Sequence, residues 1–172
     1  MPYISNAVEY GLHCLLYLVS PPGKPVDAST RELAELQGLS FEYLAKIFTK
    51  LHRAGIVAGT EGTGGGFSLA RAPEKISVLD VVVAIDGKKS LFDCRGVRTN
   101  CAVFGKTAPR WASKGLCSIH AVMLEAEASM QAVLASHSLA DLSTRLTAKA
   151  PASFAIDIAN WLGERSTSRR DY

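Results

Sequence analysis

The sequence of 172 residues contains no run of eighteen consecutive apolar residues, so we expect no membrane-spanning helix. Its first residues lack the basic-then-apolar order of a secretory signal, which predicts a cytoplasmic protein without a membrane partner. Charge is sparse as well, since charged residues make up 20% and the formal net charge is only +3. So small a positive excess neither requires nor excludes a polyanionic partner.

Catalytic patterns are also missing from the sequence. There is no Ser-His-Asp pattern and no nucleophile-elbow motif, and the cysteines have no convincing catalytic partner. An enzyme is therefore the least favoured class of protein. The hydrophobic content of 48% is typical of an ordinary globular domain, and the length leaves room for an extended appendage beside one core.

Only four cysteines are present, and no two of them form a C-x-x-C pair. Cysteines of cytoplasmic proteins are normally reduced, so disulfides are not the expected use. Cys14 lies within the apolar run GLHCLLYLV and is predicted to pack in the core. The other three, Cys94, Cys101 and Cys117, cluster in one irregular part of the chain.

The first half of the chain contains three helical patterns. Apolar residues recur at helical spacing over residues 4–19, and PPGKP then ends that helix. The sequence STRE predicts a capping box at Ser29 for a short helix that ends at Gly38. Ser40 is the predicted cap of the next helix. The inward stripe of that helix consists of Leu44, Ile47, Phe48 and Leu51.

The glycine-rich stretch EGTGGG separates two short strands, IVAGT and FSLAR, and is therefore predicted to be a hairpin tip. A phosphate-binding loop would need a helix directly after the glycines, but a strand follows. Two short helices joined by a tight glycine turn and followed by a hairpin indicate a winged helix-turn-helix. The predicted fold class is mainly α with a small β-hairpin wing.

The helix after Ser40 presents a polar outward face. Its exposed positions are Glu42, Lys46, Thr49 and Arg53, with Lys50 beside them. An isolated helix with this face is usually just solvated, but the flanking capped helix and wing favour a recognition helix for the DNA major groove. Glycines at the wing tip would let backbone amides approach phosphates closely. The predicted DNA-binding residues are Ser40, Glu42, Tyr43, Lys46, Thr49, Lys50, Arg53, Gly64, Gly65 and Gly66.

The second half begins with a short helix, SVLDVVVAI, for which Ser77 is the predicted cap. Residues 86–116 have little periodicity and are predicted to form a long loop. The stretch CSIHAVMLEAEASMQAVLAS resumes helical spacing, and its apolar side predicts packing on a symmetry mate. A weaker helix, SFAIDIANWLGE, and a frayed basic tail, RSTSRRDY, are predicted to end the chain.

The stretch from RELAELQGLS to ISVLDVV resembles the winged-helix core of IscR/NsrR-type regulators, the Rrf2 family, most specifically in the wing GTGGGFSLAR. The resemblance extends over residues 1–143 and implies a homodimeric DNA-binding transcription regulator, often a repressor. Its partner would be double-stranded DNA with a palindromic operator. The implied parts are a winged helix-turn-helix domain (1–86), a cysteine-containing sensor loop (87–116), a dimerisation helix region (117–143) and a C-terminal helix with a basic tail (144–172).

In the sensor branch of this family, the resemblance implies an iron–sulfur cluster held by three loop cysteines. The chain supplies Cys94, Cys101 and Cys117, although gaps of six and fifteen residues depart from the usual short, nearly equal gaps. Glu9 and His13, four residues apart on one helix face, resemble the pair with which some members complete a cluster across the dimer. These members favour a 2Fe-2S over a 4Fe-4S cluster.

Several alternatives stay open at this stage. Without the family, Glu9 and His13 are more simply a hydrogen-bonded surface pair. Three cysteines with one histidine are also a standard structural zinc set, and a bare thiol switch or a cluster-free member with a small-molecule pocket are further rivals. If both Glu9 and His13 bind the cluster, either Cys94 or Cys101 is spare.

Three further histidines have weaker roles in this interpretation. His120, one turn after Cys117, is a reserve ligand, whereas His52 and His137 are expected to be ordinary surface or interface residues. The sensed signal stays open among redox change, nitric oxide and iron–sulfur status.

Overall fold

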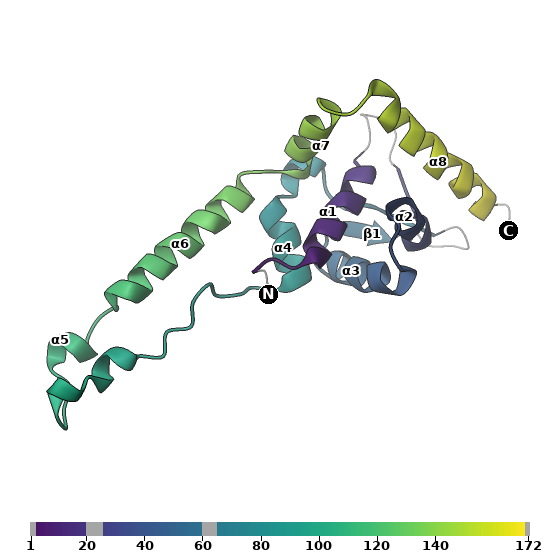
Figure 1. The fold of residues 1–172 in the computed structure, drawn as a ribbon. Coiled ribbons are helices and arrows are strands. Elements are labelled where there is room, and N and C mark those ends of the chain that lie inside the picture. The colour runs from purple at the N-terminus through teal and green to yellow at the C-terminus, as the bar shows by residue number, and fades with distance from the viewer. Residues whose placement is uncertain (1–2, 20–25, 60–64, 171–172) are drawn as a thin grey trace. The chain divides into compact units, whose positions relative to one another are not determined.

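The computed structural model describes residues 3–19, 26–59 and 65–170. It divides into a winged-helix unit, residues 1–87 with 134–172, and a loop unit, residues 88–133. Helices dominate both units, and the winged-helix unit adds a two-stranded antiparallel sheet (Figure 1). The predicted fold class is thereby confirmed. Among the described residues, no helix is both long and apolar enough to span a membrane.

The helix-turn-helix begins as its sequence predicts. Before α2 (Thr30–Gln37), the Ser29 hydroxyl accepts a hydrogen bond from the Glu32 amide, and the Glu32 carboxylate accepts one from the Ser29 amide. This capping box satisfies two N–H groups that the first helical turn leaves unpaired. The helix ends at Gly38, whose φ of 68° is the left-handed conformation that glycine adopts most readily.

The second helix of the motif is α3 (Phe41–Arg53), which Ser40 caps by accepting a hydrogen bond from the Tyr43 amide. Its whole inward stripe is buried as predicted: Leu44, Ile47, Phe48 and Leu51. Each such side chain contributes about 1.5–3 kcal/mol when it leaves water, so this stripe anchors α3 firmly against its neighbours. The outward face of the helix is therefore held in a defined orientation.

The hairpin consists of β1 (Val57–Gly59) and β2 (Phe67–Leu69), which pair antiparallel. The other edge of β2 is covered too, because Ala28 and Phe67 exchange two backbone hydrogen bonds of 2.8 and 3.1 Å. The sequence alone did not predict this third participant. The predicted tip between the strands lies mostly at residues 60–64, outside the described residues.

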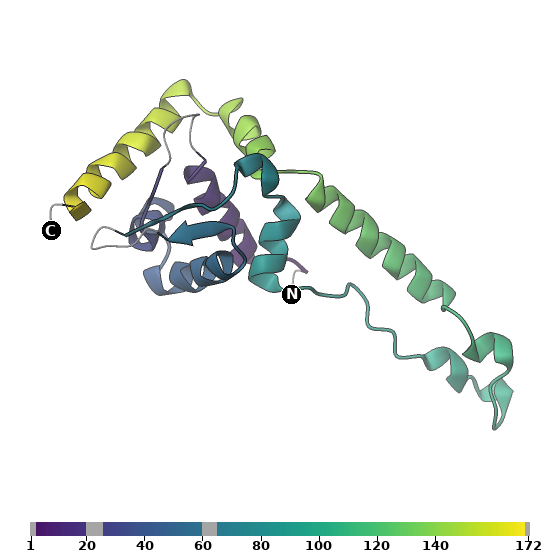
Figure 2. The same cartoon turned by 180° about the vertical axis from the view of Figure 1, so that it is seen from behind.

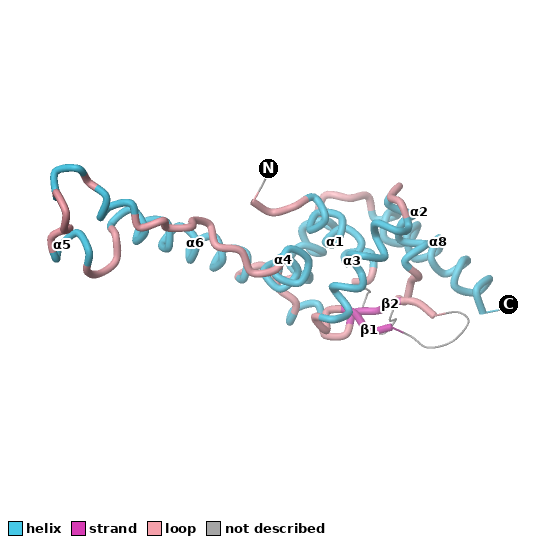
Figure 3. The backbone as a smooth tube through the Cα atoms, turned by 90° about the horizontal axis from the view of Figure 1, so that it is seen from below, coloured by secondary structure: helices cyan, strands magenta, loops and turns pink. Residues whose placement is uncertain are grey.

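Two helices pack behind α3. α1 (Asn6–Tyr17) and α4 (Val78–Asp86) contact each other and α3, and the strands lie beside α3 (Figure 3). Ser77 caps α4 as predicted, and Asp80 completes a second capping box there. The shared core is almost entirely aliphatic, and it includes Cys14, which is fully buried as predicted.

The last two helices, α7 (Leu139–Thr147) and α8 (Ala152–Arg170), follow one another around a sharp turn (Figure 2). The buried Leu162 joins α8 to the core, and Arg165 pairs with Glu35 of α2 at 3.0 Å. The prediction of a frayed tail from Arg165 onward is wrong for the backbone, which stays helical through Arg170.

The loop unit is more structured than its lack of periodicity predicted. It contains two 3₁₀ turns, η2 (Val97–Asn100) and η3 (Ala102–Phe104), and a short helix, α5 (Arg110–Ser113). Such one-turn elements are too short to show a hydrophobic period, which is why the pattern suggested only a loop. The long helix α6 (Ser118–Ala135) follows as predicted.

Candidate DNA-binding helix and cysteine loop

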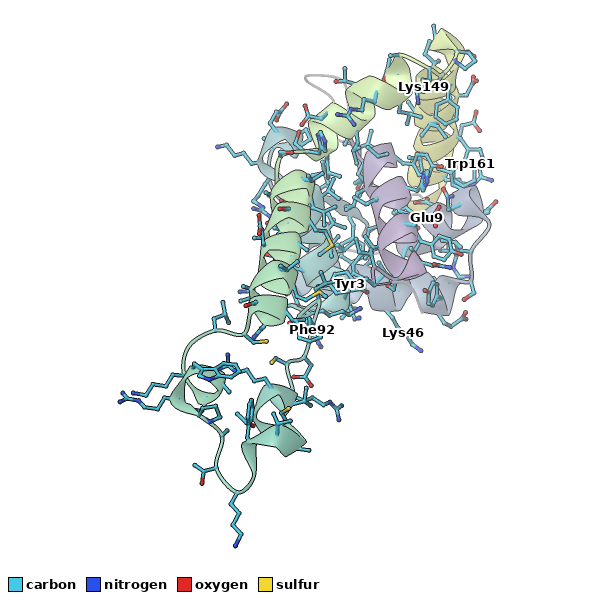
Figure 4. The ribbon with its side chains drawn as sticks, turned by 60° about the vertical axis from the view of Figure 1, so that its left-hand side comes forward. Tyr3, Glu9, Lys46, Phe92, Lys149 and Trp161 are labelled. Carbon is cyan, nitrogen blue, oxygen red and sulfur yellow. The ribbon has the colours of Figure 1, made fainter. Side chains whose placement is uncertain are left out.

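The predicted recognition face of α3 is exposed. Glu42, Lys46, Thr49 and Arg53 all lie on the solvent side of the helix. Lys46 extends away from α1, the helix that carries Glu9 (Figure 4). This face therefore has the accessibility that insertion into a major groove requires.

Lys50 and Thr49 also donate hydrogen bonds to backbone carbonyls inside the chain. Lys50 donates a hydrogen bond of 2.6 Å to the carbonyl of Ile85, near the C-terminus of α4. An ammonium group is favoured there because unpaired carbonyls give a helix C-terminus partial negative charge. The Thr49 hydroxyl donates to the Ala45 carbonyl within α3 at 2.8 Å. Lys50 thus joins α3 to α4 in addition to flanking the recognition face.

Aromatic residues surround the first turn of α3. Tyr43 packs edge-to-face against Tyr10 of α1, with ring centroids 5.9 Å apart. Phe41 is 39% exposed, and the guanidinium of Arg31 lies over its ring at 5.0 Å. Arg31 was missed by the sequence reasoning, although a cation in the first turn of α2 is a recognisable signal, because that helix crosses the DNA backbone in helix-turn-helix proteins.

The wing glycines are only partly described. Gly65 is half-buried and Gly66 is buried, whereas Gly64 lies outside the described residues. The predicted approach of this tip to DNA therefore stays a prediction.

The three clustered cysteines all belong to the loop unit. Cys94 and Cys101 are exposed and Cys117 is partly exposed, so their thiols are available for chemistry. Cys14 differs sharply, because burial raises the pKa of its thiol to about 12 and leaves it protonated and inert.

Cys117 directly precedes α6, and its sulfur accepts hydrogen bonds from the backbone amides of His120 and Ile119. These amides, together with the positive charge of Arg98, hold the pKa of the Cys117 thiol below its usual value. Amides at a helix N-terminus favour a bound anion for the same reason. The thiolate, which is the form that binds metals, is therefore favoured at this position.

Glu9 and His13 are both exposed on α1, as their spacing predicted. They belong to the winged-helix unit, whereas the three cysteines belong to the loop unit. Within the part of the chain that the structure describes, no three cysteine, histidine or carboxylate side chains gather closely enough to hold a metal ion. The predicted site draws ligands from two subunits, so one chain alone is not expected to assemble it.

The donor set nevertheless suits an iron–sulfur cluster. Accessible thiols, one of them with a lowered pKa, provide the thiolates by which such clusters are held. The paired carboxylate and imidazole on α1 offer two further donors of the kinds that proteins use for iron. The residues present therefore fit the group.

Comparison with known proteins identifies the family. The model of the Rrf2 family, described as an iron-dependent transcriptional regulator, matches residues 4–145. The chain belongs to this family. α8 lies beyond the matched residues, as the sequence resemblance had indicated.

Individual Rrf2 relatives agree with this assignment. The HTH-type transcriptional regulator NsrR of Halalkalibacterium halodurans is 28% identical over 141 residues, which cover 82% of this chain and 90% of the relative. The protein rrf2 of Nitratidesulfovibrio vulgaris is 32% identical over 139 residues, which cover 81% and 85% of the two chains. The solved structure of T. potens IscR superposes with a TM-score of 0.63 at 26% identity, covering 87% of this chain and 93% of that one.

Membership in the Rrf2 family makes this chain a DNA-binding transcriptional regulator and not an enzyme, as predicted.

Proposed function

We propose that this protein is a homodimeric cytoplasmic regulator, most simply a repressor, whose binding to a palindromic operator responds to an iron–sulfur cluster. The observation that carries the proposal is Cys117, a partly exposed thiol with a lowered pKa at the start of α6. The family description as iron-dependent and the NsrR and IscR relatives support the same chemistry.

DNA recognition is assigned to α3 and the wing. Lys46, Thr49 and Arg53 would face the base edges and phosphates of the major groove, with Glu42 and Tyr43 at the first turn. Arg31 joins this set as a phosphate contact, because its fork of donors suits phosphate oxygens and Phe41 restricts its motion. Ser40 and Lys50 support the set through the bonds that hold α3.

The cluster, when bound, supplies an anionic centre that gains or loses an electron and reacts with small oxidants. Thiolates drawn from Cys94, Cys101 and Cys117 would be the loop ligands, and Glu9 or His13 of the partner subunit, or both, would complete the set. We favour a 2Fe-2S over a 4Fe-4S cluster because the candidate ligands include a carboxylate and an imidazole, so that few thiolates would be needed.

Connected contacts lead from α6 to the recognition helix. Just after α6, the His137 carbonyl accepts a 2.8 Å hydrogen bond from the Val78 amide at the start of α4. The Leu139 amide donates to the Ile76 carbonyl at 2.9 Å, which closes the junction. At the other end of α4, the Ile85 carbonyl holds Lys50 of α3. A shift of α6 would reach α3 through α4, which couples the cysteine loop to DNA affinity.

The test is anaerobic purification followed by ultraviolet–visible spectroscopy, with iron and sulfide assays and operator binding measured before and after cluster removal. We expect a coloured protein with sulfide-to-iron near one and a change in operator affinity on removal. If the purified protein is colourless and contains zinc, cluster sensing is ruled out and the metal site is a structural zinc site. If the purified protein is colourless and contains no metal, the remaining functions are a thiol switch and a regulator that binds a small molecule.

One observation favours the small-molecule alternative as a second candidate. A cavity of about 100 Å³ lies in the winged-helix unit between α1, α7 and α8. Its lining is mainly apolar and includes Leu16, Leu146, Phe154 and Ile158. In the metal-free protein, a small apolar compound should then change operator affinity. Ala155→Leu, which fills the cavity, should abolish this response. Both results together would identify this mode of control.

A further inference from the structure

The loop unit is held together by four cross-links between its outgoing and returning halves. Nearest to the winged-helix unit in sequence, the Leu91 amide donates to the Glu127 carboxylate of α6 at 2.9 Å. The Phe92 ring then lies 5.9 Å from the His120 ring, centroid to centroid. These two contacts attach residues 91 and 92 to α6.

The remaining two cross-links lie nearer to residues 105–110, which connect the outgoing and returning halves of the loop unit. Arg98 of η2 donates hydrogen bonds to the carbonyls of Lys114 and Gly115, just before α6. Phe104 packs edge-to-face against Trp111 of α5, with centroids 5.5 Å apart. Residues 90–104 and 111–127 therefore run as two opposed segments joined at four successive points.

The Phe92–His120 and Arg98–Gly115 cross-links bound one interval of this ladder of contacts, and the Arg98–Gly115 and Phe104–Trp111 cross-links bound the next. Cys94 lies between the Phe92 and Arg98 cross-links, and Cys117 lies between the corresponding partners, Gly115 and His120. These two thiols thus belong to the same interval, on opposite segments. Cys101 belongs to the next interval, where the opposed residues 111–114 are WASK and offer no thiol, imidazole or carboxylate.

Both thiols lie close in sequence to the Phe92–His120 contact. Cys94 is two residues from Phe92 and Cys117 is three residues from His120, and each residue spans at most about 3.6 Å. Cys101 instead separates η2 from η3, and its carbonyl accepts a hydrogen bond from the Phe104 amide at 3.0 Å. Cys101 follows Arg98 on the side of the Phe104–Trp111 contact, whereas Cys117 follows Gly115 on the side of the Phe92–His120 contact, so the Arg98 cross-link separates these two cysteines in the order of contacts.

We infer that Cys94 and Cys117 form the thiol pair of the loop unit and that Cys101 is the spare cysteine. The identity of the bound group rests on the proposed function, but the pairing is a property of the unloaded chain. With Glu9 and His13 of the partner subunit, this pair makes the four ligands that a 2Fe-2S cluster needs.

The pairing is tested first in the metal-free, reduced full-length protein with phenylarsine oxide, a trivalent arsenical that binds two neighbouring thiols. Each thiol forms an As–S bond and passes its proton to the departing oxygen, which leaves as water, so no oxidant is needed. We expect Cys101→Ser to bind the arsenical as tightly as the unaltered chain. Cys94→Ser and Cys117→Ser should bind it about a hundredfold more weakly, because the second thiol no longer adds effective concentration.

The same three variants are then assayed for iron and sulfide after anaerobic purification. Cys101→Ser should keep the content of the unaltered chain, and the other two should lose it. Tight arsenical binding in Cys94→Ser, or loss in Cys101→Ser equal to that in Cys94→Ser, would overturn the pairing. If the unaltered chain holds no cluster, the proposed function fails while the arsenical measurement still decides the pairing.

A second pair of variants tests the ladder without altering any cysteine. Arg98→Gln removes the cross-link beside the two thiols and should weaken arsenical binding about threefold or more. Arg95→Gln removes the same charge from the same segment and should leave binding unchanged. Equal affinities of the two variants would show that Arg98 does not hold the thiols together. Thermal unfolding of each variant verifies that the chain is folded.

Discussion

Side chains on one exposed helix face can serve recognition or structure, and α3 contains both kinds. Lys46 extends into solvent, whereas Lys50, one turn further on, gives its ammonium group to the Ile85 carbonyl. The thiols differ in a similar way, because Cys117 of the loop unit accepts backbone hydrogen bonds, whereas Cys14 of α1 is sealed in the core. Residue type alone does not separate these roles, so each is tested by its own substitution.

The double substitution Lys46→Ala, Thr49→Ala should abolish sequence-specific DNA binding while the fold and the dimer persist. Each direct base contact is worth about 1–3 kcal/mol, so operator affinity should fall about a hundredfold or more. Fluorescence anisotropy with operator and scrambled duplexes measures both affinities. Lys149→Ala, an exposed lysine after α7, is the matched control. Specific binding that survives in the double variant would rule out this placement of α3.

The lowered pKa of Cys117 predicts the pH dependence of its reactivity in the metal-free protein. A lower pKa means more thiolate at a given pH, so alkylation by iodoacetamide should reach its plateau at lower pH than in an ordinary thiol. Arg98→Gln should move the profile toward higher pH, because a favourable positive charge is lost. Mass spectrometry of tryptic peptides follows Cys117, and Cys14 should stay unmodified throughout. A plateau at or above that of a free cysteine peptide would contradict this prediction.

Among the helices, the junction of α3 with α4 stands out because a lysine bridges them. The 2.6 Å bond from Lys50 ends on the last turn of α4, where a cation also opposes the helix dipole. α8 makes a second such junction, since Arg165 stacks on Trp161 at 3.6 Å and pairs with Glu35 of α2. Both junctions brace the helix-turn-helix from outside its own sequence.

Two matched substitutions on α3 separate support from recognition. Lys50→Gln should lower the free energy of unfolding by about 1 kcal/mol, because the charged donor to the Ile85 carbonyl is lost. Lys46→Gln should leave stability unchanged and reduce operator affinity more than Lys50→Gln does. Urea unfolding and anisotropy titrations provide the two measurements. If Lys50→Gln changed affinity alone, the bond to α4 would have no structural value.

At the scale of the whole molecule, α6 presents an apolar face that is exposed in the single chain. α6 has no buried residue among its eighteen, and Ile119, Val122 and Val133 are 64%, 62% and 59% exposed. The sequence predicted that the apolar side of this helix, Ile119, Val122, Ala126, Met130, Val133 and Leu134, packs on a symmetry mate. Large exposed aliphatic side chains in one row are typical of an interface between subunits.

Val122→Asp should therefore convert the dimer into a monomer, because a carboxylate would be buried without a partner. Operator binding should weaken as well, since two half-sites need two recognition helices. Size-exclusion chromatography with light scattering gives the mass. Ala128→Asp is the control, because it adds the same charge about 120° further round the exposed helix. A dimer that survives Val122→Asp would place the interface elsewhere.

Local features of the fold were predictable from the sequence by itself. The capping box at Ser29, the cap at Ser77, the terminator Gly38 and the buried stripe of α3 all involve residues within a few positions of one another. The local amino-acid sequence determines hydrogen bonds between residues three or four positions apart and the 3.6-residue hydrophobic period. The polar face of α3 and the cluster of cysteines were visible for the same reason.

Contacts between distant segments were decided only by the tertiary structure. The pairing of Ala28 with Phe67, the bond from Lys50 to Ile85, and the Arg98 cross-link join residues 39, 35 and 16 or 17 positions apart. Nothing in the local pattern of a chain specifies which of many exposed cations or strand edges will meet, because that depends on how the packed helices bring segments together. The interval shared by Cys94 and Cys117 is such a property: their spacing in sequence obscured it, and only the folded loop unit places them in the same interval.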